Sequence, residues 1–187
     1  FFESAGWGLS PRVLALRNED RRAIEQMPVV REVFRDHLVY AGALLRTFAE
    51  SYIEDDCFTA EVTTEGGAQR WEELTDLVVK GTRVYGGMWV FDPTSRHDDG
   101  LFEVVPFAGR MDWLSKGMVH LETTGALSTA LEEVGVTHSR GVRARSITLR
   151  FDTRPGALPL AAQIDGEEFP ATAQARIEVL PRALRLV

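Results

Sequence analysis

The sequence predicts a mainly β fold of the α+β class, a β-sandwich of antiparallel strands with two or three peripheral helices. From residue 57 onward, apolar residues recur at every second position in short runs, and turn-forming residues separate these runs. This pattern is typical of antiparallel strands with one buried face. Two other segments carry apolar residues at spacings of three and four, the period of an amphipathic helix. We therefore expect a single domain over residues 1–187, with its helices outside the strands.

The expected helices cover residues 28–52 and 113–135. His37 lies on the apolar stripe of the first helix, where a core or boundary histidine is more common than a catalytic one. Gly135 suits the end of the second helix, because glycine adopts the left-handed conformation that often follows a helix. Residues 1–17 are punctuated by glycine and then become apolar, which predicts a turn followed by a short helix or strand.

The strands are predicted from alternation and from the turn signals between them. Gly86 and Gly87 fall inside one of these runs, where a glycine pair permits a bulge or the close approach of another group. The expected strands cover residues 57–62, 73–79, 85–91, 102–107, 144–151, 160–164, 175–179 and 183–187.

Composition and charge restrict the possible function. The chain has 187 residues, a formal net charge of −7 and a pI near 5.2. It therefore lacks the general basic character of proteins that bind nucleic acid. Cys57 is the only cysteine, which excludes an internal disulfide and a cysteine metal cluster and favours the cytoplasm. The chain begins at Phe1 with no starting Met and no signal-peptide pattern, so we expect a fragment or a processed product.

The most informative segment is Gln163-Ile164-Asp165-Gly166-Glu167, which places two carboxylates on either side of a glycine between two expected strands. A turn at Gly166 can direct both acids toward one point, where a carboxylate can accept a proton from an alcohol. The same residues are also typical of a plain hairpin turn. The segment alone leaves both interpretations open.

A second acid–glycine turn, Asp98-Asp99-Gly100, precedes an expected strand. Carboxylates and backbone carbonyls in such a turn can hold a hard cation, although a solvated turn that caps the next strand is the simpler interpretation. The chain has no Gly-rich loop of the kind that cradles phosphates. If phosphate chemistry takes place here, another part of the protein must hold the nucleotide.

The order of these motifs resembles the C-terminal half of the diacylglycerol kinase and sphingosine kinase family. The resemblance rests on Ala-Gly-x-Gly near the start, the Gly-Gly strand, the Asp-Asp-Gly turn, Gln-x-Asp-Gly-Glu, and the closing Val-Leu-Pro-x-Ala-Leu. It covers residues 1–8 and 78–187 and is weak over residues 20–75. No single motif is specific, and the joint order carries the likeness.

The resemblance implies a domain that receives a lipid and is covered by a separate N-terminal ATP-binding domain. By the resemblance this chain is the second domain only, so we expect phosphoryl transfer to require the ATP-binding domain as well. By position in the motif, Glu167 is the favoured proton acceptor in a transfer of the ATP γ-phosphate to the hydroxyl of a diacylglycerol or sphingoid lipid. Asp165 is its neighbour or the alternative base. ATP would be bound mainly by the missing domain.

The resemblance also implies a structural Mg²⁺ at the Asp-Asp-Gly turn. Its ligands would be the side chain of Asp99 and the main-chain carbonyls of Arg96 and Leu101. The expected partners are a lipid substrate, the N-terminal ATP-binding domain and the inner surface of the cell membrane, with a homodimer left open. The apolar residues that could line a lipid crevice, each more often plain core, are Trp7, Trp89, Phe91, Phe107, Trp113 and Met118.

Two alternatives belong to other classes. A lipid-binding or interaction module could use the same fold without chemistry, and it would be indifferent to substitution of Asp165 or Glu167. A kinase for a soluble nucleotide, as the NAD kinases are, is the weaker alternative because this half of the chain has no polar, nucleotide-shaped signature.

Overall fold

The computed structural model describes residues 3–25, 57–83, 85, 96, 98–109, 112, 141–157 and 159–180. The helices expected over 28–52 and 113–135, and the strands expected over 86–91 and 183–187, lie outside these residues. The described elements, in chain order, are β1 (Ser4–Gly8), α1 (Leu9–Glu25), β2 (Phe58–Thr64), β3 (Gly67–Lys80), β4 (Phe102–Ala108), β5 (Val142–Ala144), β6 (Ser146–Thr153), β7 (Ala162–Ile164), β8 (Glu167–Phe169) and β9 (Gln174–Glu178).

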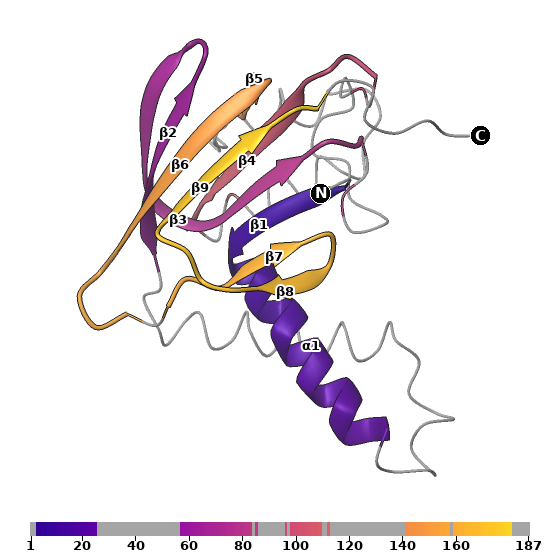
Figure 1. The fold of residues 1–187 in the computed structure, drawn as a ribbon. Helices are drawn as coiled ribbons and strands as arrows, with labels where there is room; N and C mark the ends of the chain where they lie inside the picture. Colours follow the sequence, from indigo (N-terminus) through magenta and orange to yellow (C-terminus); the bar gives the residue numbers. More distant parts are fainter. Residues whose placement is uncertain are drawn as a thin grey trace, which may run out of the picture.

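The nine described strands belong to one sheet, in which neighbours pair antiparallel in the order β8-β7-β1-β3-β2-β6-β9. β4 lies off this path and pairs with both β3 and β5. Figure 1 shows that the sheet curls, so that one sheet encloses the core. The predicted mainly β fold with antiparallel strands is confirmed.

One face of the sheet carries the main core. On β2, Phe58, Ala60 and Val62 are buried, and the residues between them are not, which is the alternation that predicted this strand. Their buried neighbours in the same apolar cluster come from six further strands and are Ala5, Trp7, Leu74, Leu77, Val79, Phe102, Val104, Ala144, Ile147, Leu149 and Ala162. We call this side of the sheet the core face.

β3 is longer than the sequence predicts. Its first half pairs with β2 and its second half with β1 and β4. Glu73 has a positive φ of 55°, and the pairing register shifts beside it, between Phe58 and Ala60. The strand bends there, as a β-bulge does. Residues 67–73 are mostly exposed, so this half has none of the apolar alternation that would reveal a strand in the sequence.

The strand β1 and the helix α1 replace the turn and short element expected over residues 1–17. Gly8 joins them with a φ of 108°, and a Cβ at this position would lie 2.5 Å from the carbonyl oxygen of Thr75. The buried carboxylate of Asp76 accepts a hydrogen bond of 3.3 Å from the main-chain N–H of Ser10 in the first turn of α1. This contact satisfies one of the N–H groups that a helix start leaves unpaired.

α1 begins where β1 ends and extends away from the sheet (Figure 1). Leu9, Val13 and Leu14 are buried at its start. Side-chain contacts with β3 and β8 place it on the side of the sheet opposite the core face, which we call the helix face. No described helix combines the length and the apolar character needed to cross a membrane.

Candidate functional site

The Asp-Gly-Glu segment forms the tip of the β7–β8 hairpin, beside the first residues of β1 (Figure 1). Ile164 pairs with Glu167, so Asp165 and Gly166 make a two-residue loop. Both loop residues have positive φ, 50° for Asp165 and 81° for Gly166. This is the backbone that a type I′ turn requires, and Asp-Gly is among the sequences that prefer it.

Asp165 fastens the turn to the first residues of β1. Its Oδ1 accepts hydrogen bonds of 2.8 Å from the N–H of Glu3 and 3.0 Å from the N–H of Ser4. Its own N–H donates to the carbonyl oxygen of Ser4 at 2.8 Å. These contacts give the Asp165 carboxylate a structural task, because one of its oxygens is already directed at two main-chain donors.

Gln163 fastens the same turn from the helix face. Its Oε1 accepts a hydrogen bond of 2.8 Å from the N–H of Gly166, and its Nε2 donates to the Oγ of Ser4 at 3.3 Å. The side chain is buried, with 4% of its surface exposed, and it lies over Gly6. The hairpin is therefore tied to β1 by two side chains, Gln163 and Asp165.

The side chain of Glu167 is exposed. Unlike the carboxylate of Asp165, the carboxylate of Glu167 makes no hydrogen bond or ion pair within the residues that the structure describes. Its register partner Ile164 pairs in turn with Ala5, and Ala5 pairs with the buried Val79. Directly paired residues share one face of a sheet. Glu167 therefore stands at the rim of the core face, at the end of a row of apolar side chains.

Glu168 points to the other side. It pairs with Gln163 and accepts a hydrogen bond of 3.0 Å from the Nδ2 of Asn18 on α1. The alternation of β8 thus separates two adjacent glutamates, and only Glu167 lies on the apolar side. This separation supplies a matched control for any role of Glu167.

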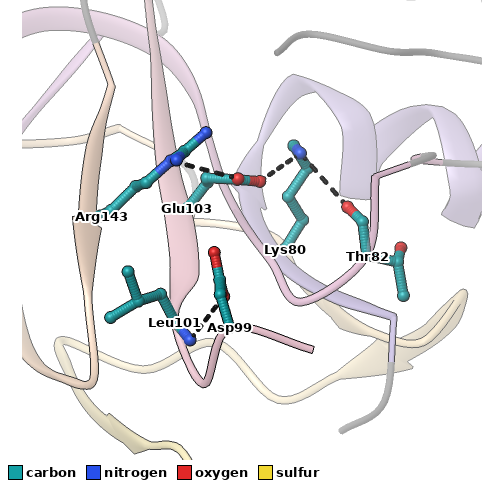
Figure 2. Close-up of polar contacts among 6 residues, drawn as sticks. All are labelled: Lys80, Thr82, Asp99, Leu101, Glu103 and Arg143. Carbon is teal, nitrogen blue, oxygen red and sulfur yellow. Dashed lines mark hydrogen bonds and ion pairs between the residues drawn. The ribbon is translucent and has the colours of Figure 1, made fainter. Parts of the chain in front are cut away.

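The Asp98-Asp99-Gly100 turn is ordered by its own acids. Asp99 Oδ1 accepts a hydrogen bond of 2.9 Å from the N–H of Leu101, just before β4 begins (Figure 2). Asp98 instead pairs with the guanidinium of Arg96, with 3.1 Å between Arg96 Nε and Asp98 Oδ1. The hydrogen bond that Arg96 donates to Asp98 is the main cause that raises the pKa of Arg96 above its ordinary value.

The two acids of the turn differ in what holds them. Asp98 is engaged by the guanidinium of Arg96, and Asp99 Oδ1 accepts from the N–H of Leu101. A hard cation here would have the Asp99 side chain as its ligand, with main-chain carbonyls to complete the oxygen set. Across the described ranges, no group of three or more His, Cys, Asp and Glu side chains is placed to hold a metal ion. A cation at this turn would therefore depend mainly on carbonyl oxygens.

A buried charge cluster that the sequence analysis missed lies on the helix face. Lys80 Nζ contacts the carboxylate of Glu103 and donates to the carbonyl oxygen of Thr82 at 3.2 Å (Figure 2). Arg143 Nε lies 3.5 Å from the other oxygen of Glu103. The sequence of β3 and of β4 does not predict this pair, because Lys80 and Glu103 each lie in a largely apolar run. A single charged residue within such a run is the signal that could have located each of them.

The cluster lies in the same cross-strand row as the start of β1. Ser4 pairs with Lys80, Lys80 pairs with Glu103, and Glu103 pairs with Arg143. Ser4 also receives the contacts from Gln163 and Asp165. The helix face of the sheet thus carries a continuous row of polar side chains from the hairpin to β5, in a place where polar groups must be paired to be tolerated.

The residues proposed to line a lipid crevice are core residues where the structure describes them. Trp7 is 4% exposed and packs against Phe151, with 5.1 Å between ring centroids. Phe107 is fully buried on the helix face with Val78 and Val105. The other candidates, Trp89, Phe91, Trp113 and Met118, lie outside the described residues.

Comparison with known proteins supports the fold. No protein-family model and no curated protein matches the sequence. A solved structure described as a "putative diacylglycerol kinase from Bacillus anthracis str. Sterne" superposes with a TM-score of 0.53 at 17% identity, covering 97% of this chain and 50% of that chain. The resemblance predicted from the motif order is confirmed for the fold. The chain spans about half the length of the structure that it matches.

Two further structures from the same organism are described as diacylglycerol kinases. They match with 16% and 18% identity and a TM-score of 0.46 each, and they cover 97% of this chain. The chain covers 50% and 48% of their lengths. At such identities the likeness concerns the fold, and the roles of individual residues must be argued from their own geometry.

Proposed function

We propose that this chain is the acceptor-side domain of a lipid kinase, which transfers the γ-phosphate of ATP to a lipid hydroxyl. The observation that carries the proposal is the hairpin tip, where Glu167 stands on a turn fastened by Gln163 and Asp165. Among the described residues, the Glu167 carboxylate has no bonded partner. Its place at the rim of the apolar core face suits an acceptor that is itself apolar. The fold shared with half of a diacylglycerol kinase structure supports the same assignment.

In this proposal Glu167 is the general base. A lipid alcohol is too weak an acid to lose its proton to a carboxylate in advance. Glu167 would orient the hydroxyl and accept its proton while the oxygen bonds to the γ-phosphorus and ADP leaves. Asp165 would not compete for this task, because its Oδ1 is directed at two main-chain N–H groups. The structure thus favours Glu167 over Asp165, which the sequence alone left as an alternative base.

The nucleotide and the metal that assists transfer would be held mainly by a separate N-terminal ATP-binding domain. Magnesium supplies charge stabilisation to the phosphates when it is bound there. On this chain, Asp99 with the carbonyls of Arg96 and Leu101 would hold a structural Mg²⁺ that keeps the turn before β4 in place. The lipid and that domain are the proposed partners, with transfer taking place at the cytoplasmic membrane surface.

The test is phosphoryl transfer by the complete gene product that contains this chain. Radiolabelled ATP is supplied with mixed micelles of diacylglycerol or sphingosine, and Glu167→Gln is compared with Glu168→Gln. We expect Glu167→Gln to lower kcat by about 10²–10⁴-fold, the range for general-base removal, and Glu168→Gln to stay near wild type. A wild type that phosphorylates neither lipid would refute the lipid-kinase proposal. Full activity of Glu167→Gln would refute the role of Glu167 as base.

A lipid-binding module without chemistry is the second candidate. It is favoured by the exposure of Asp165, Gly166, Glu167 and Glu168, which is ordinary for a hairpin tip. Binding to lipid vesicles that is unaffected by Asp165→Asn and Glu167→Gln, together with no phosphoryl transfer, would establish this alternative.

A further inference from the structure

The side chain of Gln163 crosses β1 at Gly6, and the crossing depends on the glycine. Gly6 and Gln163 pair in register and share the helix face. A Cβ added to Gly6 would lie 3.2 Å from Gln163 Nε2 and 3.5 Å from Ser10 Oγ. The first distance is tighter than ordinary carbon–nitrogen contact. Any side chain at position 6 would therefore displace the Gln163 amide.

The oxygen and the nitrogen of the Gln163 side-chain amide bond to different partners. Oε1 accepts from the N–H of Gly166 at 2.8 Å, and Nε2 donates to Ser4 Oγ at 3.3 Å. Gly166 is the residue immediately before Glu167, so its φ and ψ determine the direction in which Glu167 leaves the turn. Holding the N–H of Gly166 therefore restricts the direction of Glu167 without any contact with its carboxylate.

The Gln163 side chain holds the loop firmly because it is buried and because Asp165 holds the loop from the opposite side. Gln163 is 4% exposed, so an amide that lost a partner would be left without water to replace it. Asp165 holds the outer side of the same loop through Glu3 and Ser4. A two-residue loop fastened at both residues has little freedom, whereas Glu167 itself is left unfastened and able to meet a substrate.

We propose that Gln163 is a positioning residue for Glu167, and that Gly6 belongs to the same device because it leaves room for the Gln163 amide. The inference rests on the proposed function, in which Glu167 meets the acceptor hydroxyl. A small displacement is enough to matter, since a misplacement of about 1 Å can cost about 10²-fold in rate.

The test measures kcat and KM for lipid and ATP in the complete gene product. Gln163→Met keeps the length of the side chain and removes both hydrogen bonds. Gly6→Ala shifts the position of the Gln163 amide but leaves the Gln163 side chain itself unchanged. We expect Gln163→Met to lower kcat by about 10–100-fold and Gly6→Ala to lower kcat as well. The KM for lipid and the KM for ATP should each change less than about twofold. Gln174→Met, on the exposed edge strand β9, is the matched control and should behave as wild type.

A second arm separates positioning from a general loss of stability. In the Glu167→Gln background the group being positioned has lost its function, so Gln163→Met should cost no further activity. Gln163→Glu, which keeps an acceptor for the N–H of Gly166, should recover much of kcat. On the isolated chain, amide exchange at Gly166 should quicken about tenfold or more in Gln163→Met.

The outcomes separate the two claims. If Glu167→Gln lowers kcat but Gln163→Met and Gly6→Ala do not, Gln163 has no positioning role. The same conclusion follows if Gln163→Met costs as much in the Glu167→Gln background as in wild type. If Glu167→Gln itself retains full activity, Glu167 is not the base and Gln163 has no catalytic group to position. If Gln163→Met does not fold, the milder Gly6→Ala and Gln163→Glu decide the question.

Discussion

Lys80 and Glu103 form an ion pair between adjacent strands in which the Lys80 side chain is wholly buried and the Glu103 side chain is 9% exposed. Removing two charges from water costs several kcal/mol for each, and their attraction offsets this only when their remaining hydrogen bonds are made. Here Thr82 and Arg143 supply further contacts, one for each charge (Figure 2). The pair therefore links the end of β3 to β4. Removing either partner alone should destabilise the fold strongly, because the other charge is left buried.

We expect Lys80→Met to lower the free energy of unfolding by about 3–5 kcal/mol, because it leaves Glu103 buried beside the more distant Arg143 alone. Urea unfolding of the isolated chain, followed by circular dichroism, measures this change.

The double variant Lys80→Met/Glu103→Leu should recover most of the loss, because it replaces both charges with apolar groups of similar size. A double variant as unstable as the sum of the two single variants would show that the residues do not act as a pair.

Two patterns predicted strands and placed their ends within about two residues. In β2 the alternation of Phe58, Ala60 and Val62 marks one buried face. In β4 the apolar run from Phe102 to Phe107 marks a strand that is buried on both faces. The first half of β3 escaped prediction because both of its faces are largely exposed. Its backbone is extended only because β2 pairs with it, and no local pattern records a partner strand.

The sequence predicted the turn but not the contacts that hold it. Glycine between two acids located the turn, and the motif order favours Glu167 as base, which stays a prediction. The distinct role of Asp165 depends on the start of β1, more than 150 residues away in the chain. The helix-face row from Ser4 to Arg143 is likewise created by strand register. Long-range contacts of this kind leave no trace in local spacing.

Asp165→Asn is expected to leave stability nearly unchanged, within about 0.5 kcal/mol. Asparagine tolerates positive φ and retains an oxygen for the N–H groups of Glu3 and Ser4. Asp165→Ala should lose about 1–3 kcal/mol, because these donors lose their acceptor in a strained backbone. Thermal unfolding of the two variants measures the difference. In the complete gene product, Asp165→Asn should also keep most of the kcat for the proposed transfer, and its inactivation would instead identify Asp165 as the base.

Gly8→Ala should destabilise the chain strongly, by more than about 2 kcal/mol. The new Cβ would meet the Thr75 carbonyl at 2.5 Å, and the φ of 108° is unfavourable for any L side chain. Gly156→Ala is the control, since Gly156 also has a positive φ, 82°, but its Cβ would meet nothing within 4 Å. It should cost only about 1 kcal/mol of backbone strain. Equal losses in both variants would show that the contact with Thr75 contributes nothing.

Magnesium binding at the Asp-Asp-Gly turn predicts a difference between its two acids. Asp99→Asn should abolish the rise in melting temperature that Mg²⁺ or Ca²⁺ produces in wild type, because a binding ligand stabilises the folded state by mass action. Asp98→Asn should retain that rise, because Asp98 is engaged by the guanidinium of Arg96. Calorimetric titration with each cation, before and after treatment with EDTA, supplies the affinity. Wild type that gains no stability from either cation would leave Asp99 as the cap of Leu101 alone, a task that its hydrogen bond of 2.9 Å already performs.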